Sequence, residues 1–335
     1  MNDDSDACTK AANLALHPLF RASNIYQMII SYLSILPLFY FLAFKFSKSS
    51  FHGNLKVIFY CYFITLILFS TVYGVTATIQ FIRPLTAIRS CDLIVPSLHH
   101  KIGNLPICFL VTLSAYFPFT ITVERYYAMN KSEKYEKMPI ILGPLFVLFI
   151  VIVNFGVIFQ IYKNETFSHG DVAFSVFTFY VVLFLINLLD VMFNLVLLRK
   201  NIKLKKKLTH SPLTAKYQLE EVYQTTKFSI LLILIYIFSQ FNASGLIFFR
   251  YLGNLIISEP NLLFGIRTIF ATIVPTYHFI IGIFSILFFN RIQRNENETI
   301  QMSSTGKSGA NNYDQAIFSI WNSISAVTDR TVTLT

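Results

Sequence analysis

The sequence predicts an all-α membrane protein, a seven-transmembrane helix bundle with its N-terminus outside and its C-terminus in the cytoplasm. Three observations predict this class: an apolar composition, seven long apolar stretches, and an uneven distribution of Lys and Arg between the loops. Of the 335 residues, 54% are hydrophobic and 13% are charged, and the mean hydropathy is +0.57. A soluble domain would carry about 25% charged residues, so the chain requires lipid as its solvent.

Each of the seven apolar stretches is at least ~20 residues long, which is enough for a helix to cross a ~30 Å hydrocarbon core. Six of them contain no Asp, Glu, Lys or Arg, and the fifth contains only Asp190. They are too long and too continuous for membrane β-strands, which alternate over about 10 residues. The spans are expected at about 25–44, 57–82, 102–123, 138–162, 172–198, 228–249 and 268–290.

The distribution of Lys and Arg between the loops sets the expected orientation. The loops after the first, third and fifth spans hold 15 of these residues, whereas the loops after the second, fourth and sixth hold 6. Because basic loops stay in the cytoplasm, residues 1–24 are expected to form an extracellular tail, 25–290 the seven-helix domain and 291–335 a cytoplasmic tail. The cytoplasmic tail is rich in Ser, Thr, Asn and Gly and is expected to be largely disordered.

Two features fall on the outer side in this orientation. The sequon Asn164-Glu165-Thr166 lies in an outer loop, where Asn164 can be glycosylated. Cys8 in the outer tail and Cys91 in an outer loop both face an oxidising compartment, so a disulfide can form between them. Two free or differently paired thiols are the alternative.

A carboxylate, a guanidinium and a phenol follow directly on the third span, as Glu124-Arg125-Tyr126. At a membrane edge, Glu124 and Arg125 can pair in a reduced dielectric, and breaking the pair would free Arg125 to bind a partner or another helix. The alternative is that Arg125 only anchors the inner end of the span, because basic residues favour that side of the membrane.

The fifth span carries an intramembrane polar patch of Asn187, Asp190 and Asn194, which sit within about 60° of one another on one helical face. A carboxylate inside a membrane helix indicates function. The patch either rearranges on activation or is a static contact between helices. The loop that follows is basic, and its lysines can meet the anionic lipid of the inner leaflet. These lysines are Lys203, Lys205, Lys206 and Lys207.

Longer stretches resemble the nematode serpentine chemoreceptors of the Sra superfamily, most closely its class alpha/beta (Srab). They are CDLIVPSLHHKIGNLP (91–106), FPFTITVERYYAMNKSEKYEK (117–137), LLDVMFNLVLLRKNIKLKKKL (188–208), TAKYQLEEVYQTTKFS (214–229) and STGKSGANNYDQAIFSIWN (304–322). Glu124-Arg125-Tyr126 likewise resembles the (Asp/Glu)-Arg-Tyr motif that ends the third helix of G-protein-coupled receptors.

The resemblance implies a seven-helix chemosensory receptor in the plasma membrane of sensory neurons or their cilia. It also implies a heterotrimeric G protein as partner, which Arg125 meets when the helices open and which the basic loop can contact. The chain departs from the rhodopsin-type pattern, however. The sixth span has neither Pro nor Trp, the seventh has Val274-Pro275-Thr276-Tyr277 in place of Asn-Pro-x-x-Tyr, and the loop KNETFSHGD lacks the usual Cys.

A ligand is expected to enter from outside, between the outer halves of the third, fifth, sixth and seventh spans. The side chains placed there by depth alone are aromatic or neutral and polar. We therefore expect a neutral or weakly polar small molecule rather than an amine or a free acid. The candidate pocket residues are Phe109, Thr112, Tyr116, Thr178, Tyr180, Gln240, Asn242, Thr268 and Thr272.

No pattern in the sequence indicates an enzyme, a cofactor or a metal site. No two of the 7 His residues have the i, i+4 spacing of a helical metal site, and there is no nucleophile–base pattern or glycine-rich phosphate loop. The net charge of +10 lies in short loops, so nucleic acid is not an expected partner. A seven-span ligand-gated channel and a transporter remain as alternatives. The charge distribution argues against the channel type whose N-terminus is inside, and the lack of a repeat argues against a transporter.

Overall fold

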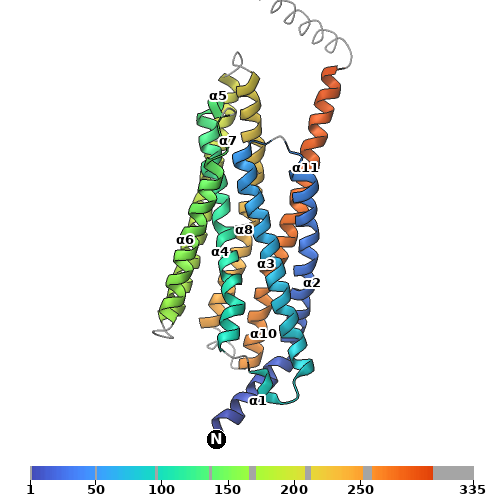
Figure 1. Cartoon of the computed structure of the whole chain (residues 1–335), viewed down its shortest axis with the longest axis vertical. Helices are drawn as coiled ribbons and strands as arrows, with labels where there is room; N and C mark the ends of the chain where they lie inside the picture. The colour runs from blue at the N-terminus through green and yellow to red at the C-terminus, as the bar shows by residue number, and fades with distance from the viewer. Residues whose placement is uncertain are drawn as a thin grey trace, which may run out of the picture. The chain divides into compact units, whose positions relative to one another are not determined.

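A computed structural model describes residues 2–49, 51–94, 97–135, 138–165, 171–207, 213–251 and 259–304. Side chains are described for 8–49, 51–94, 103–131, 134–135, 138–160, 181–205, 218–239, 259 and 261–292. All regular structure in this part of the chain is helical (Figure 1). The elements are α1 (Asn2–Leu16), α2 (Pro18–Tyr40), η1 (Phe41–Phe46), α3 (Gly53–Thr86), η2 (Ser90–Leu93), α4 (Ser97–Asn130), α5 (Ser132–Tyr135), α6 (Leu142–Glu165), α7 (Asp171–Lys207), α8 (Leu213–Tyr251), α10 (Pro260–Ala271) and α11 (Ile273–Ser304).

Within the described residues, seven helical segments are long and apolar enough to cross a membrane, which confirms the predicted seven-span class. Several segments extend beyond the predicted spans. The first begins at Pro18 rather than at residue 25, because the fixed φ of Pro suits the first turn of a helix. The seventh joins α10 to α11 across Thr272. The segments are Pro18–Phe46, Gly53–Thr86, Gly103–Asn130, Leu142–Gln160, Val181–Lys205, Gln218–Ser239 and Asn261–Ile292.

The chain divides into two compact units, Met1–Ser285 and Ile286–Thr335. The first unit contains the helix bundle as far as the middle of α11. Within the second unit, α11 continues to Ser304, so residues 291–304 of the expected tail are helical. The remainder of the expected tail lies outside the described residues.

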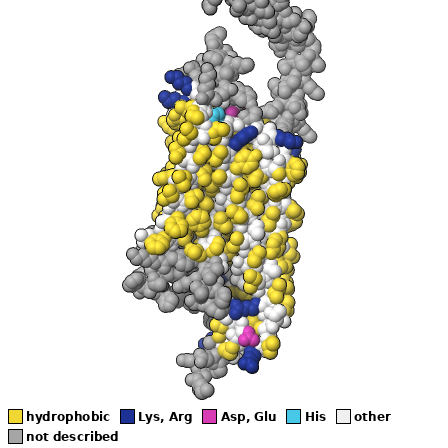
Figure 2. Space-filling model, in the orientation of Figure 1, with side chains coloured by type: hydrophobic (Ala, Val, Ile, Leu, Met, Phe, Trp, Pro, Cys, Tyr) yellow, Lys and Arg dark blue, Asp and Glu magenta, His cyan; other side chains and the backbone are white. Residues whose placement is uncertain are grey.

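The helix α4 has the central position in the bundle. It packs against α3, α6, α7 and α8, whereas α2 pairs with α3 and with α10 (Figure 1). On the face drawn in Figure 2, apolar side chains form a broad band, and Lys and Arg side chains lie at its two borders. This distribution is the one expected of a helix bundle that meets lipid around its middle and water at its ends.

One end of the bundle carries α1, η2 and α10, and we call it the disulfide end. A disulfide between Cys8 and Cys91 joins α1 to η2. Arg83, near the end of α3, donates from Nε to the Asp92 carbonyl oxygen at 3.0 Å and from Nη2 to the Ile94 carbonyl oxygen at 2.8 Å. These contacts order the segment that follows α3.

Buried polar contacts link the helices in the middle of the bundle. Ser70 of α3 hydrogen-bonds to Ser34 of α2 at 2.9 Å and to His278 Nδ1 of α11 at 3.2 Å. The hydroxyls of Tyr62 and Tyr277 lie 3.1 Å apart and join α3 to α11 in the same way. Because a bilayer offers no water to polar groups at this depth, such pairs satisfy each other across helix contacts.

Candidate functional site

The opposite end of the bundle carries Arg125, which lies in the last turns of α4, and we call it the Arg125 end. The Arg125 side chain is 0% exposed, and so is that of Glu124. Arg125 donates to Glu124 Oε1 from Nη2 at 2.7 Å and to Glu124 Oε2 from Nε. Burying a charge is costly unless it is paired and hydrogen-bonded. The two-point contact between a planar guanidinium and a carboxylate meets that requirement.

A second carboxyl group reaches Arg125 from another helix. Glu221 of α8 accepts a hydrogen bond from Arg125 Nη1 at 3.1 Å, and Thr225, one turn later on α8, lies 3.3 Å from the same nitrogen. Glu221 Oε1 also accepts from the backbone N–H of His52 at 3.2 Å. Arg125 therefore ties α4 to α8, and Glu221 extends the connection to the beginning of α3.

Tyr135 of α5 closes the site from the side of the loop between α4 and α6. It is fully buried and donates its hydroxyl proton to Glu124 Oε1, and its ring centroid lies 4.3 Å from that of His52. Burial and the negative charge of Glu124 raise the pKa of the Tyr135 hydroxyl. Tyr135 therefore stays protonated and keeps its role as donor. We name the group of Glu124, Arg125, Tyr135, Glu221 and Thr225 the Arg125 cage.

Apolar side chains from α4, α7 and α8 pack around Tyr135 of the cage. Together with Tyr135 they form a buried cluster, and they are Ala128, Met129, Leu197, Leu219 and Val222. Removal of water lowers the local dielectric and strengthens the contacts of Arg125. The same apolar cover makes the loss of a single partner costly, because it leaves a buried charge without compensation.

Tyr126 does not belong to the cage, although it is the third residue of the motif. Its side chain is 42% exposed and lies on the outer side of α4. Its ring centroid is 5.7 Å from that of Phe193 and 5.5 Å from Lys200 Nζ. The structure thus brings Glu124 and Arg125 together and separates Tyr126 from them.

The lysines after the fifth span take different positions. Lys205 forms an ion pair with Glu220 of α8, in which the two side chains are 52% and 41% exposed. An exposed pair of this kind contributes at most about 1 kcal/mol. Lys203 is exposed on α7. The side chains of Lys206 and Lys207 lie outside the described residues.

The intramembrane polar patch is completely buried. Asn194 Nδ2 donates to Thr122 Oγ1 on α4 at 2.6 Å, and it lies 3.2 Å from Asp190 Oδ1. Asn187 instead donates to the Leu183 carbonyl oxygen of its own helix at 2.8 Å. The hydrogen bond between α4 and α7 is therefore made by Asn194, which Asp190 contacts within α7, whereas the Asn187 bond stays within α7.

The five candidate pocket residues whose side chains are described do not all line one of the two cavities found among the described residues. Thr112 contacts Asn154 of α6 at 2.6 Å, and Thr268 accepts from Ser23 of α2 at 2.8 Å, so both hydroxyls join helices. The Phe109 carbonyl oxygen accepts from Asn154 Nδ2 at 2.9 Å. The candidates were chosen by their depth in the membrane, and depth alone does not tell which way a helix is rotated and hence which neighbour a side chain meets.

Two of the candidates line separate cavities. Tyr116 lines a groove of about 660 Å³ between α4, α6 and α7. Thr272 lines a smaller cavity of about 290 Å³ that also contacts Tyr26 and Thr276. The side chains of Thr178, Tyr180, Gln240 and Asn242, and that of the sequon residue Asn164, lie outside the described residues.

Sequence reasoning did not assign three members of the cage, Tyr135, Glu221 and Thr225. The spacing of Glu221 and Thr225 is one helical turn, which puts both on one face of an extended sixth helix. A carboxylate on that face, at the same membrane depth as Arg125, could have indicated that Glu221 is a partner of Arg125. Tyr135 had none, because its position depends on the conformation of the loop.

Comparison with known proteins assigns the family. A profile described as "Serpentine type 7TM GPCR chemoreceptor Srb" matches residues 16–242, which include the whole Arg125 cage. The chain belongs to the Srb family of serpentine chemoreceptors. It is 56% identical to serpentine receptor class beta-11 of Caenorhabditis elegans over 346 residues, covering 100% of both chains. It is also 38% identical to class beta-7 and 36% identical to class beta-15 of the same organism, over 97% of this chain and 98% and 100% of theirs.

These matches confirm the predicted resemblance to nematode serpentine receptors and correct its finer part. The sequence stretches suggested class alpha/beta, whereas the matching family is class beta. Short stretches do not separate classes that share a seven-span plan, but a match over the full length does. The Srb family is a family of multi-pass membrane receptors and not of enzymes.

Proposed function

We propose that this Srb protein is a G-protein-coupled chemosensory receptor and that the Arg125 cage is its resting switch. The observation that carries the proposal is the burial of Arg125 between carboxyl groups on two different helices, α4 and α8. A cation with only an anchoring role would extend into the interface between membrane and water. A fully buried cation between two helices instead forms a contact that helix separation breaks.

Activation follows from a difference in ligand affinity between two arrangements of the bundle. A ligand that binds better to the open arrangement shifts the population towards it. The ends of α7 and α8 at the Arg125 end then move away from α4, and Glu221 leaves Arg125. The freed guanidinium becomes available to the G protein, and the basic end of α7 adds further contacts to the G protein and to anionic lipid of the inner leaflet.

The distribution of buried charge supports a neutral or weakly polar ligand. Among the described side chains, the buried Asp, Glu, Lys and Arg are Glu124, Arg125, Asp190 and Glu221. Three of these four belong to the cage. A charged amine bound deep between the helices would need a carboxylate partner. The cage carboxyl groups are already engaged with Arg125, and Asp190, the other buried carboxyl group among the described side chains, is 2% exposed and contacts Asn194.

The orientation and location of the receptor are part of the same proposal. The excess of Lys and Arg in the odd-numbered loops supports a cytoplasmic Arg125 end. The disulfide at the opposite end is compatible with an extracellular position, where disulfides persist. The plasma membrane of sensory neurons is the expected location for a member of a chemoreceptor family.

A G-protein activation assay tests the proposal. Cells would express the receptor with a panel of Gα subunits and receive mixtures of small molecules, with Arg125→Ala run beside wild type at matched surface expression. We expect a response in wild type that is lost in Arg125→Ala. Lys48→Ala serves as a control, because it removes an exposed cation between η1 and α3 without touching the cage or the basic end of α7.

The alternative functions give different results in this assay. A ligand-gated current that needs no G protein and survives Arg125→Ala would contradict the proposal in favour of a channel. Ligand accumulation inside the cell that depends on an ion gradient would contradict it in favour of a transporter.

A further inference from the structure

The seventh span is interrupted beside a cavity that is rich in hydroxyl groups. α10 ends at Ala271 and α11 begins at Ile273. Pro275 contributes to this break, because it has no N–H to donate to the Ala271 carbonyl oxygen. Tyr73 of α3 donates its hydroxyl proton to that carbonyl oxygen instead, at 3.1 Å. Contacts with a neighbouring helix thus replace part of the helical hydrogen bonding at this point.

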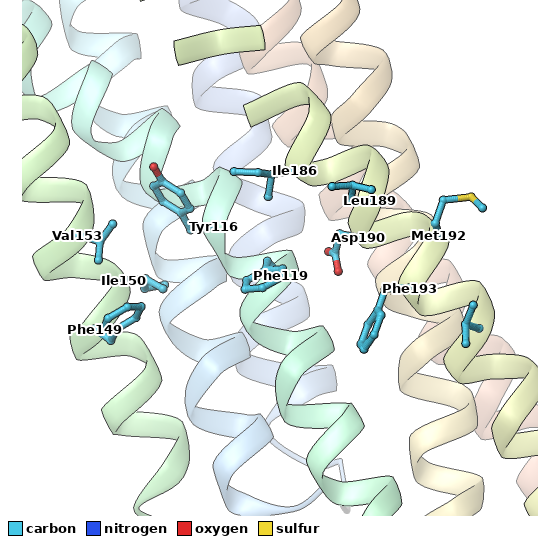
Figure 3. Close-up of a pocket in the computed structure, with 11 residues that line it drawn as sticks. Tyr116, Phe119, Phe149, Ile150, Val153, Ile186, Leu189, Asp190, Met192 and Phe193 are labelled. Carbon is cyan, nitrogen blue, oxygen red and sulfur yellow. The ribbon is translucent and has the colours of Figure 1, made fainter. Parts of the chain in front are cut away.

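The cavity at the break has a volume of about 290 Å³ and lies between α2, α8 and the two helices of the seventh span. None of its nine lining residues is charged, and five carry a hydroxyl group. The larger groove between α4, α6 and α7 differs, because the side chains in Figure 3 are apolar apart from Tyr116 and Asp190, and Asp190 is only 2% exposed. The smaller cavity therefore offers more for polar recognition. Its five hydroxyl residues are Tyr26, Ser239, Thr272, Thr276 and Tyr277.

Three of these hydroxyl groups are accessible, those of Tyr26, Thr272 and Thr276, and we call them the cavity hydroxyls. Tyr26 is 45% exposed, and Thr272 and Thr276 are half-buried. Ser239 and Tyr277 are 5% and 4% exposed, so a ligand can reach little of them.

The protons of the cavity hydroxyls are already committed within the protein. Thr272 Oγ1 donates to the Ile269 carbonyl oxygen at 2.6 Å, and Thr276 Oγ1 donates to the Thr272 carbonyl oxygen at 2.7 Å. Because the proton of Thr276 is used in this way, Tyr26 is the donor in its 3.1 Å contact with Thr276 Oγ1. The hydroxyl oxygens keep lone pairs, so towards a ligand they act as acceptors.

The surrounding lipid cannot satisfy these acceptors. Thr276 lies near the middle of the span Asn261–Ile292, at the depth of the hydrocarbon. Hydrocarbon brings no hydrogen-bond donor, so a molecule that brings one gains a contact that a lipid tail lacks. A ketone or an amide would instead bury a carbonyl oxygen without a free proton to meet it, and a protonated amine would lack a carboxylate. An alcohol is the ligand that fits.

The cavity also adjoins the helix that carries Glu221 of the Arg125 cage. α8 contributes Ile235 to the lining, and Glu221 precedes it on the same helix by roughly 21 Å, at 1.5 Å per residue. The rings of Tyr236 and Tyr277, with centroids 5.5 Å apart, join α8 to α11 nearby. A molecule held between α8 and the seventh span can therefore bias the position of α8, and with it the contact between Glu221 and Arg125.

We propose that this cavity is the ligand site of the receptor and that it takes a small neutral alcohol, whose hydroxyl donates to the cavity hydroxyls. The volume lies just below the range of about 300–1,000 Å³ that is typical of small-molecule sites, so the ligand is compact. Of the pocket residues predicted from the sequence, Thr272 belongs to this site. The role of the site in signalling rests on the proposed coupling to a G protein, whereas binding does not.

The test uses the full-length receptor in phosphatidylcholine nanodiscs and a photoactivatable, alkyne-tagged analogue of menthol, a compact cyclic alcohol. The tag can extend into lipid, because Phe238 at the edge of the cavity is 71% exposed. Mass spectrometry of the labelled peptides reports whether the label attaches to the lining parts of α2, α8, α10 and α11. Unlabelled menthol and its ketone, menthone, compete at equal concentrations in the membrane. They share the same carbon skeleton, but only menthol can donate a hydrogen bond.

In wild type we expect labelling of the cavity, with menthol competing about two- to tenfold better than menthone, as expected for one neutral hydrogen bond. The triple variant Tyr26→Phe/Thr272→Val/Thr276→Val keeps the shape of the lining but removes the cavity hydroxyls, so both competitors should become equal. Ile280→Trp should fill the cavity and reduce labelling. Ile283→Trp is its control, because Ile283 is 37% exposed on the same helix but does not line the cavity.

Four results would overturn the proposal. They are absence of label from the cavity in wild type, equal competition by menthol and menthone in wild type, a preference for menthol that persists in the triple variant, and wild-type labelling in Ile280→Trp. If the triple variant does not give monodisperse protein, the wild-type competition and the pair of Trp variants decide the question without it. Intact labelling of the cavity in a receptor that activates no G protein would contradict only the proposed coupling.

Discussion

Glu221→Gln is the substitution that best isolates the contact between α4 and α8. Gln has nearly the same shape as Glu. It keeps an oxygen that can accept from the two donors of Glu221 Oε1, which are Arg125 Nη1 at 3.1 Å and the His52 backbone N–H at 3.2 Å. It removes only the negative charge. The bond from the cationic Arg125 stays charge-assisted but loses the attraction between opposite charges. The bond from the His52 N–H changes from one with a charged acceptor, worth about 1.5–3 kcal/mol, to a neutral one, worth about 0.5–1.5 kcal/mol. The resting arrangement should therefore lose about 1–2 kcal/mol.

That loss predicts a rise in activity without ligand. Since 1.4 kcal/mol is a factor of about ten, the ratio of open to resting receptor should rise roughly five- to thirtyfold. For a receptor with about 1% in the open arrangement, within the usual range for a minor state, the open fraction becomes about 5–25%. The assay is basal nucleotide exchange on the matching Gα in membranes with equal surface expression.

Glu220→Gln is the matched control for this experiment. Glu220 is the chain neighbour of Glu221, but it pairs with Lys205 at the exposed surface and does not contact Arg125. We expect its basal exchange to equal that of wild type. Basal exchange in Glu221→Gln that does not exceed that of Glu220→Gln would refute the reasoning that Glu221 holds the receptor at rest.

Three further predictions follow from other contacts. Gly143→Val should reduce the amount of folded receptor at the cell surface, because a Cβ at Gly143 would lie 2.3 Å from the Asn54 backbone oxygen. Gly156→Val on the same helix is the control, because a Cβ there meets nothing within 4 Å, and equal surface expression of the two variants would contradict the prediction. The disulfide predicts equal losses of stability, on the order of 2–4 kcal/mol, in Cys8→Ser, in Cys91→Ser and in the double variant, because each of the three lacks the same bond. Monodispersity after heating reports the loss, and additive losses in the double variant would show that the two thiols act separately. Tyr135→Phe removes a donor to Glu124 and should lower thermal stability by about 1.5–3 kcal/mol in the same assay; unchanged stability would mean that the Tyr135 hydroxyl contributes nothing to the cage.

The number and approximate location of the spans could be predicted from the sequence, because seven uncharged stretches require lipid around them. Helix ends could be predicted only in part. The helical spacing of Tyr217, Glu220, Glu221 and Gln224 indicates that the sixth span extends beyond its apolar stretch, as α8 does, whereas α11 ends at Ser304, in polar sequence that hydropathy assigns to a tail. These ends depend on local capping and on packing between helices, for which average hydropathy carries no information.

The rotation of each helix was the second part that the sequence could not determine. In a soluble protein the polar face of a helix points to water, but membrane spans are apolar all round, so little contrast marks the inward face. Thr112 and Thr268 were expected to line a ligand pocket, and their hydroxyls contact Asn154 and Ser23 on neighbouring helices. Asp190 was expected in an internal polar patch, and it also lines the groove between α4, α6 and α7.

The candidate switch could be predicted in part. Adjacency in the sequence was enough to predict that Glu124 and Arg125 would pair, and the depth of the motif placed them at a membrane edge. The second carboxylate, Glu221, comes from a helix that begins almost ninety residues later, so only the packing of α4 against α8 brings it to Arg125.

The measurement that tests the central claim most directly is basal nucleotide exchange by the double variant Arg125→Ala/Glu221→Gln, compared with both single variants. In the account, Glu221 restrains Arg125, and Arg125 is the group that engages the G protein. Glu221→Gln can therefore raise exchange only when Arg125 is present. We therefore predict that the double variant shows exchange as low as Arg125→Ala alone. Exchange that stays as high as in Glu221→Gln would contradict the account, because activity would then rise without the guanidinium that is supposed to couple the receptor to its G protein.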